Sequence, residues 1–86
     1  MNKAEYYSAS WCSPCRIYKP ILENLQSEGY QIEFIDIDTD AEKASEKNVR
    51  SVPTMIFYNS DGEQMNRLVG VRSKDELKYY FGTKKE

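Results

Sequence analysis

The chain has 86 residues, a net charge of −2 at pH 7 and 40% hydrophobic residues. This length predicts a single domain, residues 1–86, and the composition is globular rather than disordered. The slightly acidic balance argues against a general nucleic-acid binder, and no apolar run is long enough to span a bilayer. Because the first ten residues lack the apolar stretch of a secretory signal, we expect a cytoplasmic protein that does not contact the membrane.

The first half of the chain predicts a strand, a helix and a second strand. Residues 3–8 have the pattern of a short strand, and residues 13–28 that of a helix which Gly29 ends. Residues 31–37 predict a largely buried strand, and the strand–helix–strand order favours parallel pairing of the two strands. The apolar residues expected along one face of the helix are Ile17, Ile21, Leu22 and Leu25.

The middle of the chain predicts a short helix followed by a hairpin. Residues 40–47 form the short helix, with Asp40 or Thr39 as its N-cap. Residues 54–58 and 64–69 predict two antiparallel strands, because the sequence NSDG between them is a turn signal.

The C-terminal segment predicts a last helix. Ser73 and Glu76 have the spacing of a capping box, and Leu77, Tyr80 and Phe81 fall on its inner face. Thr83–Glu86 has the composition of a frayed, charged tail. The complete order, βαβ–α–ββα, predicts an α/β fold with a mixed four-stranded sheet and helices on both faces.

The only two cysteines, Cys12 and Cys15, stand three residues apart between the first strand and the first helix. Side chains with this spacing in a first helical turn approach closely enough to form a disulfide. The closed ring is small, so the bond adds little stability and suits a redox switch. Helix amides stabilise a thiolate at the helix start, so Cys12 is the expected nucleophile. Cys15 lies one turn further in, is expected to be more buried, and resolves the mixed disulfide.

The residues around the pair suit this chemistry. Pro14 fits the first helical turn, where no backbone N–H is needed, and Pro20 is expected to kink the helix. Arg16 and Lys19 place positive charge near the thiols, although they equally suit a solvent-exposed helix surface. The chain has no histidine and no G-x-G-x-x-G motif, so we expect no bound metal, nicotinamide or flavin.

Several short motifs together resemble the thioredoxin family. They are the sequence WCSPC of residues 11–15, Pro20, VPT of residues 52–54, DGE of residues 61–63 and Val69–Gly70. The resemblance runs from Lys3 to Phe81, and W-C-x-P-C with a downstream V-P-T is highly specific. It implies a thioredoxin fold that lacks the extra N-terminal strand and helix of ordinary members, with no bound cofactor and a redox-active Cys12–Cys15 disulfide.

The resemblance also implies a function and a substrate surface. It implies a thiol–disulfide oxidoreductase that is monomeric, reduces protein disulfides and receives electrons from an NADPH-dependent thioredoxin reductase. It further implies a cis peptide bond at Pro53, which lies against the cysteines, and pairing of the Val52 backbone with an extended substrate. For Trp11, core packing is the alternative role. The residues implied in substrate binding are Trp11, Ser13, Pro14, Val52, Pro53 and Gly70.

Two positions depart from the family pattern. Tyr6 stands where most thioredoxins have a buried aspartate, and Phe34 stands where they have a lysine. A phenol is a poor base at neutral pH, and Glu5 is expected to point to the opposite face of its strand. Water or another carboxylate therefore takes the proton of Cys15, or resolution is slower than in ordinary thioredoxins.

Several alternative functions stay open at this point. Glutaredoxins usually carry C-P-Y-C and a Gly-Gly pair, whereas this chain has C-S-P-C and the single Gly70, which disfavours a glutathione-coupled reductase. An oxidase or isomerase on the same fold and a non-catalytic binding subunit are further alternatives. The last alternative is a metal or cluster site shared between two chains. The acidic run of Asp36, Asp38, Asp40 and Glu42 is more typical of a strand end and a helix start than of a partner surface.

Overall fold

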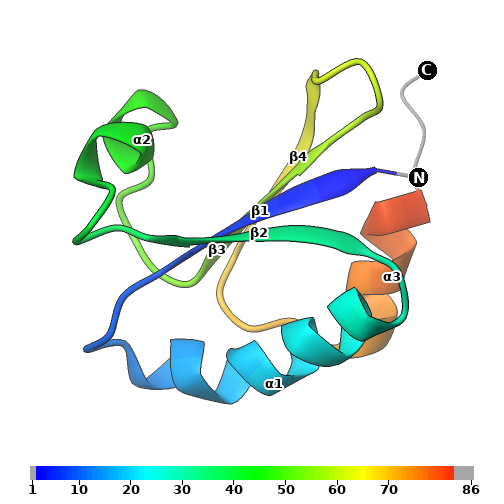
Figure 1. Cartoon of the computed structure of the whole chain (residues 1–86), viewed down its shortest axis with the longest axis horizontal. Coiled ribbons are helices and arrows are strands. Elements are labelled where there is room, and N and C mark those ends of the chain that lie inside the picture. Colours follow the sequence, from blue (N-terminus) through cyan, green and yellow to red (C-terminus); the bar gives the residue numbers. More distant parts are fainter. Residues whose placement is uncertain (1, 83–86) are drawn as a thin grey trace.

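The computed structural model describes residues 2–82, which form a four-stranded sheet with helices on both faces (Figure 1). The predicted order of elements and the mixed sheet are confirmed, and the expected tail of residues 83–86 lies outside the described residues. The elements are β1 (Lys3–Ser8), α1 (Ser13–Ser27), β2 (Gln31–Asp36), α2 (Ala41–Glu46), β3 (Thr54–Tyr58), β4 (Gln64–Val69) and α3 (Lys74–Gly82).

The strand order is β2-β1-β3-β4, so β1 and β3 occupy the centre of the sheet. β1 pairs in parallel with β2 and antiparallel with β3, which in turn pairs antiparallel with β4. All five residues of β3 are buried, as expected for an apolar strand between two neighbours. In this register Tyr6 of β1 lies beside Phe34 of β2 and Met55 of β3.

The larger core fills the space between the sheet and the helices α1 and α3, which lie on one side of it (Figure 1). Leu77 and Phe81 of α3 are fully buried there, and Tyr80 is half-buried against them, as predicted. The other large side chains of this core include Tyr6, Tyr18, Leu22, Leu25, Met55 and Phe57.

The inner face of α1 differs from the predicted one. Ile17 is 69% exposed and Ile21 is half-buried, whereas Tyr18 is completely buried. Successive helical residues differ by about 100°, so Ile17 and Tyr18 cannot both face the sheet. The prediction followed the aliphatic residues and passed over the tyrosine. The residues that α1 buries are Cys15, Tyr18, Leu22 and Leu25.

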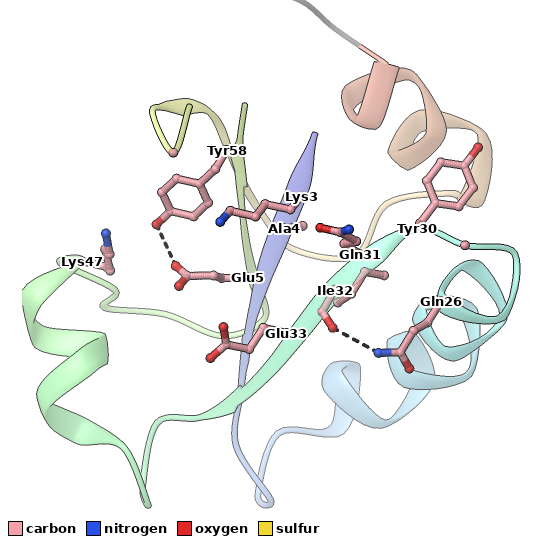
Figure 2. A pocket seen from close by; sticks show the side chains of 12 residues that line it. Lys3, Ala4, Glu5, Gln26, Tyr30, Gln31, Ile32, Glu33, Lys47 and Tyr58 are labelled. Atoms are coloured by element: carbon pink, nitrogen blue, oxygen red, sulfur yellow. Dashed lines mark hydrogen bonds between the residues drawn. The ribbon is translucent and has the colours of Figure 1, made fainter. Parts of the chain in front are cut away.

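The opposite face of the sheet carries a smaller core and a polar cluster. Tyr7, Ile56 and Tyr58 pack there with Ala44 of α2. Glu5 points to this face, as predicted from strand alternation, and lines a cavity of about 700 Å³ together with Tyr58 (Figure 2). None of the residues that line this cavity is a cysteine.

Glu5 is the centre of that polar cluster. Its carboxylate accepts hydrogen bonds from the hydroxyls of Tyr58 (2.7 Å) and Tyr7 (2.9 Å), and Lys43 of α2 lies 3.3 Å away. Partial burial alone would raise the pKa of Glu5, but these three partners outweigh burial and hold the pKa below its ordinary value. Folding therefore favours the charged carboxylate.

Local side-chain bonds begin the helices and close the hairpin as predicted. Asp40 caps α2, and Ser73 with Glu76 forms the capping box of α3. In the hairpin turn the Asn59 side chain accepts hydrogen bonds from two backbone N–H groups, and Gly62 has the positive φ of 84° that favours glycine. β3 and β4 shift register once, between Phe57 and Tyr58.

The outer edge of β2 is partly occupied by the chain itself. The N–H of Ile37 donates to the Ser8 carbonyl of β1. Because backbone N–H and C=O groups alternate in direction along a strand, those of Ile32 and Asp36 point away from β1, toward the outer edge. The Ile32 carbonyl accepts from the Gln26 side chain at 3.1 Å. The Asp36 carbonyl accepts hydrogen bonds from the hydroxyl of Thr39 and from the backbone N–H of Asp40.

We predict that Glu5→Gln lowers stability at neutral pH without affecting disulfide reduction. Loss of the charged acceptor removes about 1–2 kcal/mol from the free energy of unfolding. The lowered pKa means that this stability is present above the ordinary value of 4.5 and is lost as the pH falls through the folded-state pKa. Denaturant unfolding at neutral and acidic pH measures the difference in free energy of unfolding between the unmodified protein and Glu5→Gln. We expect this difference to shrink as the pH falls.

Glu33→Gln is the matched control, because Glu33 pairs with the same Lys43 but its side chain is 60% exposed. Its stability cost is expected to be within about 0.5 kcal/mol. A well-folded Glu5→Gln variant that lost turnover would contradict the placement of Glu5 on the face away from the cysteines.

Candidate redox site

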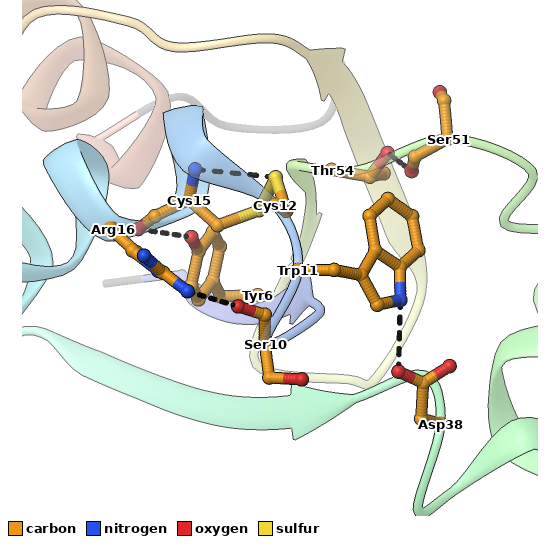
Figure 3. Close-up of a disulfide and its surroundings, with 9 residues drawn as sticks. All are labelled: Tyr6, Ser10, Trp11, Cys12, Cys15, Arg16, Asp38, Ser51 and Thr54. Carbon is orange, nitrogen blue, oxygen red and sulfur yellow. Dashed lines mark hydrogen bonds between the residues drawn. A yellow bond between two sulfur atoms is a disulfide. The ribbon is translucent and has the colours of Figure 1, made fainter.

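The two cysteines lie where the chain leaves β1 and enters α1. Cys12 is the N-cap of α1, with extended φ and ψ of −90° and 105°, and Pro14 occupies the first turn. The Cys12 and Cys15 sulfurs are bonded to each other, and their Cα atoms are 5.3 Å apart. Cys12 Sγ also accepts a hydrogen bond from the backbone N–H of Cys15 at 3.3 Å (Figure 3).

The expected difference in burial between the cysteines is wrong, because both are 4% exposed. They are bonded to each other and pack in the same core as Tyr6 and Tyr18. Their inequality lies in hydrogen bonding instead. Cys12 Sγ receives an N–H at the helix start, which favours a thiolate there once the disulfide is reduced.

Trp11 lies on the surface beside the disulfide rather than in the core. It is 64% exposed, and its indole N–H donates to the carboxylate of Asp38 at 3.0 Å (Figure 3). Asp36 in turn accepts from the Asp38 backbone N–H at 2.8 Å, which orders the loop after β2. The acidic run thus supplies an orienting contact that local sequence could not reveal, because the partner is 27 residues away.

The loop before β3 and the end of β4 meet next to this site. The Val52–Pro53 peptide bond is cis, as the family resemblance implied. The N–H of Gly70 donates to the Pro53 carbonyl at 2.9 Å, and Gly70 has the positive φ of 93° that favours glycine. Val52 is half-buried and packs against the core that contains both cysteines.

The predicted substrate-binding residues differ in how much surface they offer. Pro53 is buried, so its ring presents little area to a partner. Gly70 is half-buried, and open space surrounds the position of a Cβ there. The exposed members of the predicted set are Trp11, Ser13 and Pro14.

Arg16 is the basic residue with a defined contact at the site. Its guanidinium donates to the Ser10 carbonyl at 2.9 Å and so braces the loop that leads to Cys12. Lys19 is exposed on α1. Positive charge from Arg16 is therefore held close to the redox pair, in addition to the helix dipole.

Tyr6 lies beneath the redox pair and is a donor rather than a base. Its hydroxyl donates to the Cys15 carbonyl at 3.1 Å. Burial raises the pKa of Tyr6 to about 12, so the phenol stays protonated at neutral pH. Phe34, at the other departing position, packs edge-on against the Tyr6 ring at 5.7 Å.

Within residues 2–82, no group of three or more His, Cys, Asp or Glu side chains is arranged to hold a metal ion. None of the helices in the same range is long and apolar enough to cross a membrane. The reactive groups identified at this site are the two sulfurs.

Comparison with known proteins agrees with this geometry. The model of the family described as Thioredoxin matches residues 4–82. The chain belongs to the thioredoxin family. It is 37% identical to the thioredoxin of Chlamydia caviae over 73 residues, which cover 83% of this chain and 71% of the relative.

Two further thioredoxin relatives extend the comparison. The bifunctional thioredoxin reductase/thioredoxin of Mycobacterium leprae is 39% identical over 72 residues, covering 80% of this chain and 16% of that protein. The solved structure of a mutant thioredoxin from Halobacterium salinarum superposes with a TM-score of 0.84 at 31% identity, covering 98% of this chain and 78% of that one. With the bonded C-x-x-C pair, this membership makes the protein a thiol–disulfide oxidoreductase.

We predict that Asp38→Ala weakens reduction of protein disulfides by releasing the Trp11 indole. We expect kcat/KM to fall about two- to fivefold, which corresponds to about 0.5–1 kcal/mol for one lost hydrogen bond. Reduction of a small aromatic disulfide should be unchanged, because it needs no extended contact. Trp11 is the only tryptophan, so its fluorescence reports the loss of the contact directly.

Asp61→Ala is the control, because it removes the same charge from an exposed position in the hairpin turn. It should leave both the fluorescence and the kinetics unchanged. Equal losses in the two variants would assign the effect to net charge and not to the orientation of the indole.

Proposed function

We propose that this thioredoxin-family protein reduces disulfide bonds in other proteins, with Cys12 as the nucleophile and Cys15 as the resolving residue. The observation that carries the assignment is the Cys15 N–H directed at Cys12 Sγ, 3.3 Å away at the start of α1. This donor favours the thiolate on Cys12, and the thiolate is the form that attacks a disulfide.

The exchange proceeds in two balanced steps. The Cys12 thiolate attacks one substrate sulfur, the substrate S–S bond breaks, and the second substrate sulfur leaves as a thiolate that takes a proton. Cys15, deprotonated in turn, attacks Cys12 Sγ and expels the first substrate sulfur. The substrate gains two electrons and two protons, and the protein ends with the Cys12–Cys15 disulfide.

The proposed docking surface surrounds Cys12. Trp11, Ser13 and Pro14 offer exposed area, and Gly70 leaves room for a close backbone approach. Val52 lies just before β3, so its backbone is suited to pair with an extended segment of the substrate. Because Pro53 is buried, it sets the path of the loop before β3 and contributes little exposed area to this surface.

We further propose that a thioredoxin reductase using NADPH returns the disulfide to the dithiol. The Mycobacterium leprae relative carries a thioredoxin reductase and a thioredoxin in one protein, which supports this pairing. We propose that the protein acts as a cytoplasmic monomer. Glutathione is the less favoured donor, because the chain has the single Gly70 where glutaredoxins have a Gly-Gly pair.

We predict that Cys12→Ser abolishes insulin reduction and that Cys15→Ser traps the mixed disulfide. Without Cys15, attack on the substrate still occurs but the intermediate cannot be resolved, so a covalent adduct accumulates. Mass spectrometry of the adduct should locate the substrate sulfur on Cys12. An adduct on Cys15 in the Cys12→Ser variant, with no adduct in Cys15→Ser, would reverse the two roles.

The reduction potential of the Cys12–Cys15 pair distinguishes the two electron donors. Equilibration with glutathione at neutral pH should give a value near the roughly −270 mV of thioredoxins. A value in the range of about −200 to −230 mV, typical of glutaredoxins, would favour the glutathione-coupled alternative.

A further inference from the structure

Cys15 is held through both of its backbone polar groups. Its N–H donates to Cys12 Sγ at 3.3 Å, and its carbonyl accepts from the Tyr6 hydroxyl at 3.1 Å. The first contact connects Cys15 to the reactive sulfur, and the second connects it to the central strand β1. The residue that directs an N–H at the nucleophile is therefore anchored to the sheet from its other side (Figure 3).

Tyr6 is itself fixed in place. Its side chain is 2% exposed and lies edge-on between two rings, that of Tyr18 at 5.5 Å and that of Phe34 at 5.7 Å. β1 pairs with strands on both sides of Tyr6, so its backbone cannot shift independently. Because neighbouring rings and strands hold the Tyr6 ring in position, its hydroxyl has one direction, toward Cys15.

We propose that Tyr6 is a positioning residue of the redox pair. Its hydroxyl holds the Cys15 carbonyl and thereby keeps the Cys15 N–H aimed at Cys12 Sγ, where that N–H stabilises the thiolate of the reduced protein. The proposal rests on the proposed role of Cys12 as the nucleophile. At the position where the family usually has an acid, this chain then has a group that orients the pair and moves no proton.

The charged groups near the pair do not depend on the Tyr6 hydroxyl. Arg16 of α1 bonds to the Ser10 carbonyl, and Asp38 of the loop after β2 bonds to the Trp11 indole. Arg72, before α3, pairs with Glu76 at 3.6 Å. Tyr6→Phe therefore removes one hydrogen bond and leaves these charges in place, so a change in the pKa of Cys12 reports that bond.

Tyr18 offers a matched control within the same core. It is also a buried tyrosine, and its ring packs against that of Tyr6. Its hydroxyl has no hydrogen-bond partner within residues 2–82. Burial raises the pKa of the Tyr18 hydroxyl, and the nearby Arg72 backbone partly offsets that effect. Tyr18→Phe removes the same atom from the same core without touching Cys15.

The test is the pH dependence of Cys12 alkylation by iodoacetamide in the reduced protein, followed by mass spectrometry. In Tyr6→Phe we expect a higher Cys12 pKa and a rate at pH 7 that is about two- to fivefold lower, as for one weakened hydrogen bond to a charged group. Tyr18→Phe should match the unmodified protein. Identical titrations in all three proteins, each with a native circular dichroism spectrum, would overturn the proposal.

A second substitution covers the case in which Tyr6→Phe does not fold. Replacement of Tyr6 by 3-fluorotyrosine keeps the ring and makes the hydroxyl a stronger donor, so the Cys12 pKa should fall. An unchanged or raised pKa would also overturn the positioning role. Insulin reduction by the unmodified protein is measured separately, so a failure of the proposed function is visible even where the alkylation result supports Tyr6.

Discussion

The first turn of α1 is the constraint on which the site depends. A helix begins with backbone N–H groups that no preceding carbonyl can satisfy, and here one of them is directed at Cys12 Sγ. Cys12 can serve as the N-cap because its backbone is extended and its N–H bonds back to the Ala9 carbonyl. The local geometry that ends β1 and starts α1 thus also makes the two sulfurs chemically unequal.

The sheet keeps this chemistry apart from its other polar cluster. The redox pair and Tyr6 belong to the face covered by α1 and α3, while Glu5 and its tyrosine partners belong to the face of α2. Tyr6 and Glu5 are neighbours in sequence, yet strand alternation sends them to opposite sides. A carboxylate is therefore present next to the family's acid position but has no access to Cys15.

Short-range patterns predicted most of the fold, and long-range contacts account for what they missed. Caps, the hairpin turn and strand alternation depend on residues within about one turn of each other, so the bounds of β1, β3 and β4 agreed with expectation. The aliphatic spacing of α1 indicated Ile17 and missed Tyr18, which is buried and packs against the ring of Tyr6 in β1, a contact between separate elements.

The site shows the same division. The C-x-x-C motif identified the redox pair from a short stretch of sequence, whereas the cis bond before Pro53 was implied only by the resemblance to the thioredoxin family. The contact between Trp11 and Asp38 and the contact of Tyr6 with the Cys15 carbonyl were not predictable, since each joins separate elements through side-chain atoms. The equal burial of the two cysteines likewise follows from tertiary packing and not from their place in the helix.

The outer edge of β2 has a consequence for how the protein behaves at high concentration. An exposed edge strand is a template on which a further strand from another molecule can add, and repeated addition leads to aggregation. Here the outward carbonyls of Ile32 and Asp36 already accept bonds from the chain's own Gln26, Thr39 and Asp40. At the β4 side, the register shift beside Tyr58 breaks the regular ladder. Both features oppose growth of the sheet from one molecule to the next.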